Sequence, residues 1–204
     1  MRNPMNSWSK SDSQWNVELR WNEGDTEVFA VQDHIGQNDM ELAQRLIAGG
    51  SPHRKFLRQI IVSVDITAPL YWWKEFDTYK VGTVANSTST MHKLASTPIT
   101  MECFETDDYV SGIVDVSGYI NMLETMRQAY MKTKDKRIWK ELIRWLPEAW
   151  LQTRTITFNY EVIRQMVYWR ANHKLTEWHQ FVDWARNLPY AEELIFYDNC
   201  ASDQ

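Results

Sequence analysis

Hydrophobic and polar residues along the first third of the chain follow the pattern of strands, with one short helix between them. In residues 14–22 the apolar side chains fall on one face, which is typical of a half-buried strand. A Glu-Gly-Asp turn leads into a second β-rich run at 27–31, so the sequence predicts a hairpin. Residues 39–47 have helical spacing and end at a Gly-Gly pair. Residues 59–66 form a further β-branched run, which Pro69 ends before a short helix.

The second half of the chain is patterned mainly for helices. Residues 80–98 are rich in Ser, Thr and Gly and hold few large apolar side chains. We expect this stretch to be a loop or a short strand over a site, with an ordinary surface loop as the alternative. Beyond it, apolar faces recur at helical spacing. The predicted helices cover residues 113–131, 139–146, 157–170 and 175–184, and a charged connector at 132–137 joins the first two.

These elements predict an α+β fold, in which an N-terminal antiparallel or mixed sheet packs with long C-terminal helices. A chain of 204 residues fits one domain, and neither a Pro/Gly-rich linker nor an internal repeat divides it. We therefore expect a single domain over residues 1–204, with loosely ordered tails at 1–13 and 199–204.

Composition and charge narrow the choice of partners. Lys and Arg number 22 against 27 Asp and Glu, and the resulting net charge of −5 makes nucleic acid an unfavourable partner. Two cysteines and a polar N-terminus without a signal-peptide core lead us to expect a cytoplasmic protein. No apolar run is long enough for a membrane helix. We expect the 11 Trp residues to fill the core, subunit contacts or a ligand pocket.

Several familiar catalytic and binding motifs are missing from the sequence. It has no glycine-rich dinucleotide motif after a strand, no Walker loop, no Cys-x-x-Cys pair and no His-Glu-x-x-His motif. The five histidines lack the spacing of metal ligands, so no metal is expected. Neither cysteine lies in a recognisable nucleophile motif, and catalytic residues therefore stay unassigned.

One predicted helix carries a stripe that suits a ligand. Asn159, Ile163, Met166 and Arg170 are spaced 4, 3 and 4 residues apart, so they share one face with polar ends and an apolar middle. Such a stripe suits a flat ring held between hydrogen-bonding groups, and arginine offers a planar fork for a phosphate or carboxylate. The alternative is a core-facing helix whose polar ends reach solvent or a salt bridge.

The segment around this stripe resembles the C-terminal part of flavin-dependent thymidylate synthases (ThyX). In that family a Leu-Pro pair precedes a Thr-rich turn and a long helix with an Asn and, three turns later, an Arg. Here Leu146-Pro147, Asn159 and Arg170 fall at that spacing, and Arg144 lies near the place of a family arginine. Upstream, two further segments resemble family motifs, namely Gly50-Ser51-Pro52 and Ala68-Pro69-Leu70-Tyr71.

The family signature, Arg-His-Arg-x-x-Ser-x-Asn-Glu-x-Ser-x-Arg, can be placed on this chain in two registers. In the first, Asn86 takes the Asn position and Ser89 takes the second Ser position. In the second, which is shifted by one residue, Asn86 takes the Glu position and the conservative replacements are Lys80, Thr83 and Thr88. The sequence leaves both registers open.

The resemblance implies a ThyX fold and a homotetramer whose FAD and dUMP sites are built across subunits. In the family, NADPH reduces FAD, methylenetetrahydrofolate supplies the carbon, and dUMP is methylated to dTMP. Carried over by position, the residues that bind the nucleotide substrate are Arg170, Ser89 and Arg144. Those that bind the cofactor are Asn159, Asn86 and Lys80. Glu161 replaces a flavin-contacting arginine and reverses its charge.

Two functions remain open on this resemblance. The first is FAD-dependent methylation of dUMP. The second is a catalytically degenerate ThyX-fold protein that binds a nucleotide or another flat anionic ligand in a regulatory or phage counter-defence role. The second gains weight because the missing signature arginines would each supply charge-assisted bonds worth about 1.5–3 kcal/mol. A structural role, with the aromatic residues at a subunit interface, is the remaining alternative.

Overall fold

The computed structural model describes residues 7–22, 25–79, 81–89, 93–107, 110 and 112–197, with the backbone alone for 15–33. The chain divides into two compact units. The first unit combines two segments of sequence, Met1–Ile60 and Asn159–Gln204, and the second unit is the continuous segment Ile61–Phe158. The single domain expected over residues 1–204 stays a prediction.

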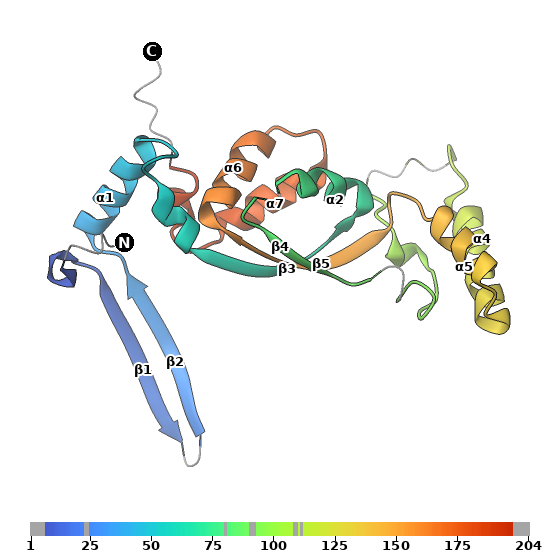
Figure 1. The fold of residues 1–204 in the computed structure, drawn as a ribbon, viewed down its shortest axis with the longest axis horizontal. Helices are drawn as coiled ribbons and strands as arrows, with labels where there is room; N and C mark the ends of the chain where they lie inside the picture. The colour runs from blue at the N-terminus through green and yellow to red at the C-terminus, as the bar shows by residue number, and fades with distance from the viewer. Residues whose placement is uncertain are drawn as a thin grey trace. The chain divides into compact units, whose positions relative to one another are not determined.

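The first unit begins with the predicted hairpin. Strands β1 (Gln14–Asn22) and β2 (Asp25–His34) pair antiparallel, and the register is interrupted once, between Glu18 and Leu19 (Figure 1). The bounds of β1 are those of the alternating pattern at 14–22, because alternation with a period of two residues is the pattern of a strand. The hairpin expected from the sequence is therefore confirmed.

Helices make up the rest of the first unit. They are η1 (Trp8–Lys10), α1 (Gln37–Ala48), η2 (Lys55–Gln59), α6 (Tyr160–Arg170), α7 (Thr176–Arg186) and α8 (Ala191–Leu194). Helix α6 packs against η2 and α7, and Ile163, Met166 and Trp178 are completely buried. The Tyr160 hydroxyl, whose pKa is raised by burial, donates to the Pro189 carbonyl oxygen at 2.7 Å. Hydrophobic burial thus holds η2, α6 and α7 together.

The segment before the hairpin is tied to α1. Asp12 accepts hydrogen bonds from the backbone N–H groups of Asn38 and Asp39 in the first turn of the helix. The hydroxyls of Ser11 and Ser13 donate to the Asp39 carboxylate at 2.5 and 2.6 Å, which lowers the pKa of that carboxyl. These bonds satisfy helix N–H groups that have no partner within α1. They fix the described part of the tail that was expected at 1–13.

The second unit contains a three-stranded sheet in the order β3-β5-β4. Its strands are β3 (Ile61–Pro69), β4 (Val84–Ser87) and β5 (Leu151–Asn159), and β4 pairs antiparallel with β5. Figure 1 shows β5 between the two edge strands. The short strand β4 lies within residues 80–98, where a loop or a short strand was expected, and the site expected beneath it stays a prediction.

The central strand corrects the helix predicted over 157–170. Residues 157–159 belong to β5, and the helix begins only at Tyr160. The run of β-branched and aromatic residues, with Ile156 and Phe158 buried on one face, favours an extended conformation. The sequence did not show this boundary, because Asn159 has the helical spacing of the stripe although it lies just before the first residue of the helix.

A short helix covers one face of this sheet. Helix α2 (Leu70–Phe76) continues into η3 (Asp77–Tyr79), and the helix begins directly after Pro69, as predicted. The Trp73 indole N–H donates to the Gln152 carbonyl oxygen at 2.9 Å, and the rings of Phe76 and Phe158 meet edge to face. Trp72 and Trp73 are each 1% exposed. Several of the tryptophans therefore fill the core, as expected.

The remaining helices of the second unit form an antiparallel pair. Helices α4 (Val116–Thr133) and α5 (Lys136–Arg144) confirm the two helices predicted over 113–131 and 139–146, and η4 (Met101–Cys103) precedes them. The connector predicted over 132–137 is wrong, because only residues 134 and 135 lie between the helices, where the αL conformation of Lys134 and the Asp135 N-cap make a tight turn. Asp115 and Asp135 cap their N-termini. Their shared core contains Leu94, Ile99, Phe104, Ile120, Leu123 and Leu142. Within the described residues, no helix combines the length and apolar character needed to cross a membrane.

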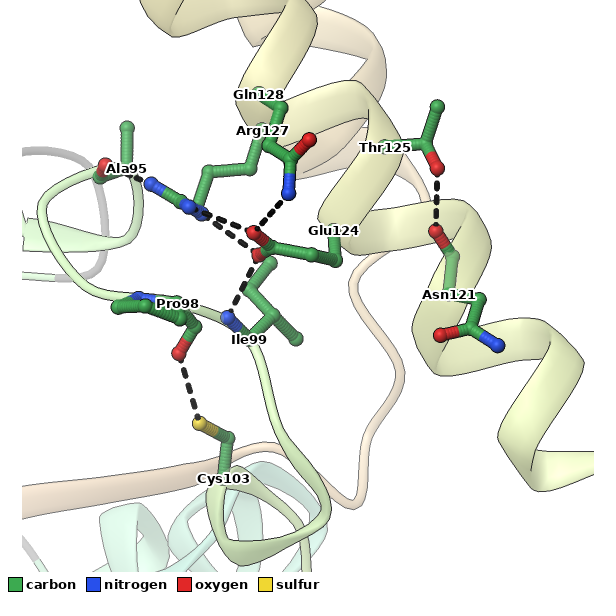
Figure 2. A network of polar contacts seen from close by, with 9 residues as sticks. All are labelled: Ala95, Pro98, Ile99, Cys103, Asn121, Glu124, Thr125, Arg127 and Gln128. Atoms are coloured by element: carbon green, nitrogen blue, oxygen red, sulfur yellow. Dashed lines mark hydrogen bonds and ion pairs between the residues drawn. The ribbon is translucent and has the colours of Figure 1, made fainter.

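A carboxylate on α4 fastens the preceding loop to this helix pair (Figure 2). Glu124 accepts hydrogen bonds from the Ile99 backbone N–H at 2.8 Å, from the Gln128 amide and from two nitrogens of Arg127. Arg127 in turn donates to the Ala95 carbonyl oxygen at 3.2 Å. We call Glu124 and Arg127 the α4 clamp, because together they hold both ends of the segment 95–99.

Candidate functional site

The face of the sheet opposite α2 is polar. Three side-chain pairs join β3 to β5 across it: Ser63 with Thr157 at 3.0 Å, Asp65 with Thr155 at 2.5 Å and Thr67 with Thr153 at 2.7 Å. We call these six residues the polar sheet face. Cross-strand hydrogen bonds of this kind stabilise a sheet and fix its register. They also present hydroxyl and carboxylate groups on a surface that α2 does not cover.

Two of the predicted site residues lie on or beside this face. Asn86 pairs in register with Thr155, so it shares the side of the polar sheet face, and it is exposed. Ser89 follows β4, is half-buried, and accepts the Lys93 backbone N–H at its carbonyl oxygen. The predicted cofactor contact Lys80 lies outside the described residues. The structure thus brings Asn86 to a polar surface, with Ser89 close along the chain.

Asn159 acts as the N-cap of α6. It is 8% exposed, and its side-chain oxygen accepts the Val162 backbone N–H at 3.1 Å. This bond satisfies one of the helix N–H groups that have no backbone partner. The predicted placement of Asn159 within the helix is wrong, since the residue ends β5, although its position at one end of the stripe is right.

Arg170 is the last residue of α6, at the opposite end of the stripe. An 11-residue helix rises about 16 Å, so Asn159 and Arg170 cannot contact the same small group directly. The Arg170 guanidinium lies over the ring of Trp178, 4.9 Å from its centroid, and Trp178 is completely buried. A planar cation stacked on an immobile ring has fewer conformations to lose when it binds an anion.

The reversed charge at Glu161 is balanced inside the first unit. Its two carboxylate oxygens lie 2.9 and 3.1 Å from Nε of Arg54, and the two side chains are only 13% and 24% exposed. Glu161 also lies in the first turn of α6, where the helix dipole favours a negative charge. This residue is therefore part of a structural ion pair, and sequence analysis missed its partner.

Arginines of the second unit also have carboxylate partners. Arg144, predicted to bind the nucleotide, is 52% exposed at its side chain and forms an ion pair with Glu141 one turn away. Arg154 donates to Asp77 at 2.9 Å and lies over the Trp73 ring at 4.3 Å. FAD carries a pyrophosphate, which requires several fixed donors with unused charge. Arg144 and Arg154 already neutralise carboxylates, so these two arginines do not offer such unused charge to FAD.

Other chemistry is limited in the described part of the chain. There, no group of three or more His, Cys, Asp or Glu side chains is placed to hold a metal ion. Cys103 is a free, half-buried thiol. The residues missed by sequence analysis, namely Arg54, Asp65, Asp77 and Thr155, come from elements distant in sequence, and only the alternating Thr residues of β5 gave a signal.

Comparison with known proteins gives a clear result only for structure. No protein-family model matches the sequence, and no curated protein matches it. Among solved structures, thymidylate synthase X of Helicobacter pylori with FAD and dUMP superposes with a TM-score of 0.62 at 15% identity, covering 78% of this chain and 82% of that one. A second structure of H. pylori flavin-dependent thymidylate synthase, complexed with FAD and dUMP, gives 0.58 at 16% identity, covering 78% and 83%. The chain has the ThyX fold.

The ThyX fold confirms the resemblance read from residues 146–170 and the predicted α+β class. At 15% identity the two chains share a fold but few side chains. Function must therefore be argued from the residues themselves.

Proposed function

We propose that this chain is a nucleotide-binding protein built on the ThyX fold. The observation that carries the proposal is Arg170, held over a buried tryptophan at the end of α6, in a fold whose H. pylori representatives were solved with dUMP. The guanidinium offers paired donors to a phosphate, and each charge-assisted hydrogen bond contributes about 1.5–3 kcal/mol. In the second unit, Ser89 remains the proposed contact to a nucleotide and Asn86 the proposed contact to a cofactor, each argued independently of Arg170.

A protein that binds a nucleotide without catalysing thymidylate synthesis agrees best with the ion pairs of the described residues. Arg144 and Arg154 are already paired with carboxylates, and Arg54 neutralises Glu161. Releasing such arginines for a ligand would cost the energy of the existing pairs. We therefore propose a binding protein with a regulatory role, for which a nucleoside monophosphate or another flat anion is the ligand.

The second candidate is FAD-dependent methylation of dUMP, with NADPH and methylenetetrahydrofolate as co-substrates. The FAD and dUMP present in the H. pylori structures favour it. Bound flavin would supply the redox chemistry of such an enzyme. A homotetramer with sites shared between subunits, as the resemblance implies, would be a way to supply cations that the chain's own residues do not bring together.

Thermal unfolding with and without ligand tests nucleotide binding. A ligand that binds only the folded state raises stability by RT ln(1 + [L]/Kd), so dUMP at about 100 times its Kd should stabilise the protein by about 2.7 kcal/mol. Uridine, which lacks the phosphate, should give a much smaller rise in melting temperature. No stabilisation by any pyrimidine or purine nucleoside monophosphate would refute the proposed nucleotide binding.

Arg170→Gln tests the residue that carries the proposal. The variant should lose most of the dUMP-induced stabilisation, measured relative to its own ligand-free melting temperature because the contact with Trp178 is lost as well. Arg170→Lys keeps the charge but not the planar fork, so its dUMP-induced stabilisation should lie between those of wild type and Arg170→Gln. The control is Arg137→Gln, since Arg137 is 90% exposed and forms its ion pair with Asp135, at the start of α5. Equal dUMP response in wild type and Arg170→Gln would remove Arg170 from the site.

A further inference from the structure

The first unit contains a cleft that the proposed nucleotide site does not use. Its volume is about 590 Å³, within the range of sites for small molecules. One wall is a stripe of α1 with residues at positions i, i+3, i+4 and i+7, and the other is the start of α8. The lining residues are His34, Ile35, Gln37, Met40, Glu41, Gln44, Tyr190 and Glu193.

Carboxylates outnumber basic side chains in this cleft. Glu41 projects from α1 and Glu193 from α8, so each wall brings one carboxylate. Both are exposed, and Glu41 accepts a hydrogen bond from the Gln37 amide at 3.1 Å. The eight lining residues include neither lysine nor arginine, and His34 is their one basic side chain. Two carboxylates against a single imidazole create a negative potential that a cation would relieve.

Aromatic and aliphatic side chains also line the cleft. Tyr190 adopts the left-handed conformation, with φ of 53°, which is uncommon for a bulky residue. Its hydroxyl oxygen accepts the Ile35 backbone N–H at 3.1 Å, so the ring is tethered to the opposite segment. Ile35 and Met40 add aliphatic and thioether surface. An aromatic face beside carboxylates favours cations that carry methylene groups over small hydrated ions.

We propose that this cleft binds an aliphatic polyamine. The ammonium groups of such a ligand would pair with Glu41 and Glu193, and its methylene chain would lie on Tyr190, Ile35 and Met40. A nucleotide is excluded on charge, because its phosphate would face both carboxylates. The proposal therefore names a second ligand class, and it stands whether or not the chain binds nucleotides.

Calorimetric titration of the full chain with spermidine tests this site. Wild type should bind with one site per chain, and Glu193→Gln and Glu41→Gln should each weaken the affinity about fivefold or more, because each removes one of two charge pairs. Glu192→Gln is the matched control, since it changes the net charge equally on the adjacent residue, which lies outside the cleft and pairs with Arg186. The control should stay within about twofold of wild type, as exposed pairs contribute little.

Two results would overturn the proposal. If Glu192→Gln weakened spermidine as much as Glu193→Gln, binding would reflect only the overall negative charge. If Mg²⁺ at equal concentration displaced spermidine, the methylene chain would contribute nothing and a simple cation effect would explain the heat. Absence of any spermidine binding to wild type at millimolar concentration would equally refute the site.

Discussion

At the scale of single residues, the Glu124 carboxylate shows how one side chain can fasten a loop to a helix. It receives four hydrogen bonds on its two oxygens, chiefly from Arg127 (Figure 2), and these lower its pKa from 4.5 to about 2. Hydrogen bonds to a carboxylate favour its charged form, and here they outweigh the cost of partial burial. The α4 clamp thus secures the loop that follows Ser89 and β4.

The clamp should make stability depend on acid. The folded pKa of Glu124 lies below the unfolded value, so its contribution is fully present above about pH 4.5 and is lost as the pH falls towards 2. Glu124→Gln should cost about 1–3 kcal/mol at neutral pH and flatten the decline in stability between these limits. Urea unfolding from pH 2.5 to 7 measures both effects.

Glu102→Gln serves as the control for that series, because Glu102 is an exposed carboxylate in η4. It should leave both the stability at neutral pH and its acid dependence close to those of wild type. If Glu124→Gln kept the full acid dependence of wild type, another carboxylate would be responsible for it.

At the scale of elements, local pattern predicted the hairpin, β3 and the longer helices, and it missed β5 and the short helix α8. The strand β1 and helices α4, α5 and α7 have one apolar face, so periodicity alone located them. β5 has a polar face of threonines and a buried face of Ile156 and Phe158, but its last residues also fit the stripe of α6. Where the strand period and the helical period both fit the same residues, packing against other segments determines the conformation. Those segments are distant in sequence, so local pattern does not reveal them.

The central position of β5 predicts a large cost for damaging it. Ile156 is completely buried at the centre of the sheet, so Ile156→Ala should lower the free energy of unfolding by about 2–5 kcal/mol through lost burial and a residual cavity. The matched change on the edge strand, Ile61→Ala, affects a residue that is 61% exposed and should cost about 0.5 kcal/mol or less. Denaturant unfolding compares the two, and similar costs would contradict the central placement of β5.

At the scale of the whole molecule, the sequence located candidate residues better than it assigned their roles. Arg170 and Asn159 were found from spacing and resemblance, and they occupy the two ends of α6. Their contacts with Trp178 and Val162, like the pairing of Glu161 with Arg54, depend on folding that brings separate segments together. Residue spacing shows which side chains share one face of a helix or strand. It does not show which side chains of other segments already contact them.

The charge pairs of both units predict a protein without flavin. The freshly purified protein should be colourless, and it should not retain added FAD after unbound cofactor is removed, because Arg144 and Arg154 are already paired with carboxylates and Arg170 is stacked on a ring. A visible absorbance spectrum before and after incubation with FAD and dUMP measures this. Retained flavin bands together with NADPH oxidation would favour the thymidylate synthase instead.

The division of the first unit between two ends of the sequence also sets the order in which the protein folds during synthesis. Leu57 is completely buried in η2, against which α6 packs, and the Ile60 carbonyl oxygen accepts the Tyr160 N–H. A ribosome that adds about 5–20 residues per second delivers α6 roughly 5–20 s after η2. The second unit, continuous from Ile61 to Phe158, has all its strands before α6 emerges. We therefore expect the second unit to fold before the first one. Until α6 is synthesised, the apolar surfaces of α1 and η2 stay exposed and can bind chaperones.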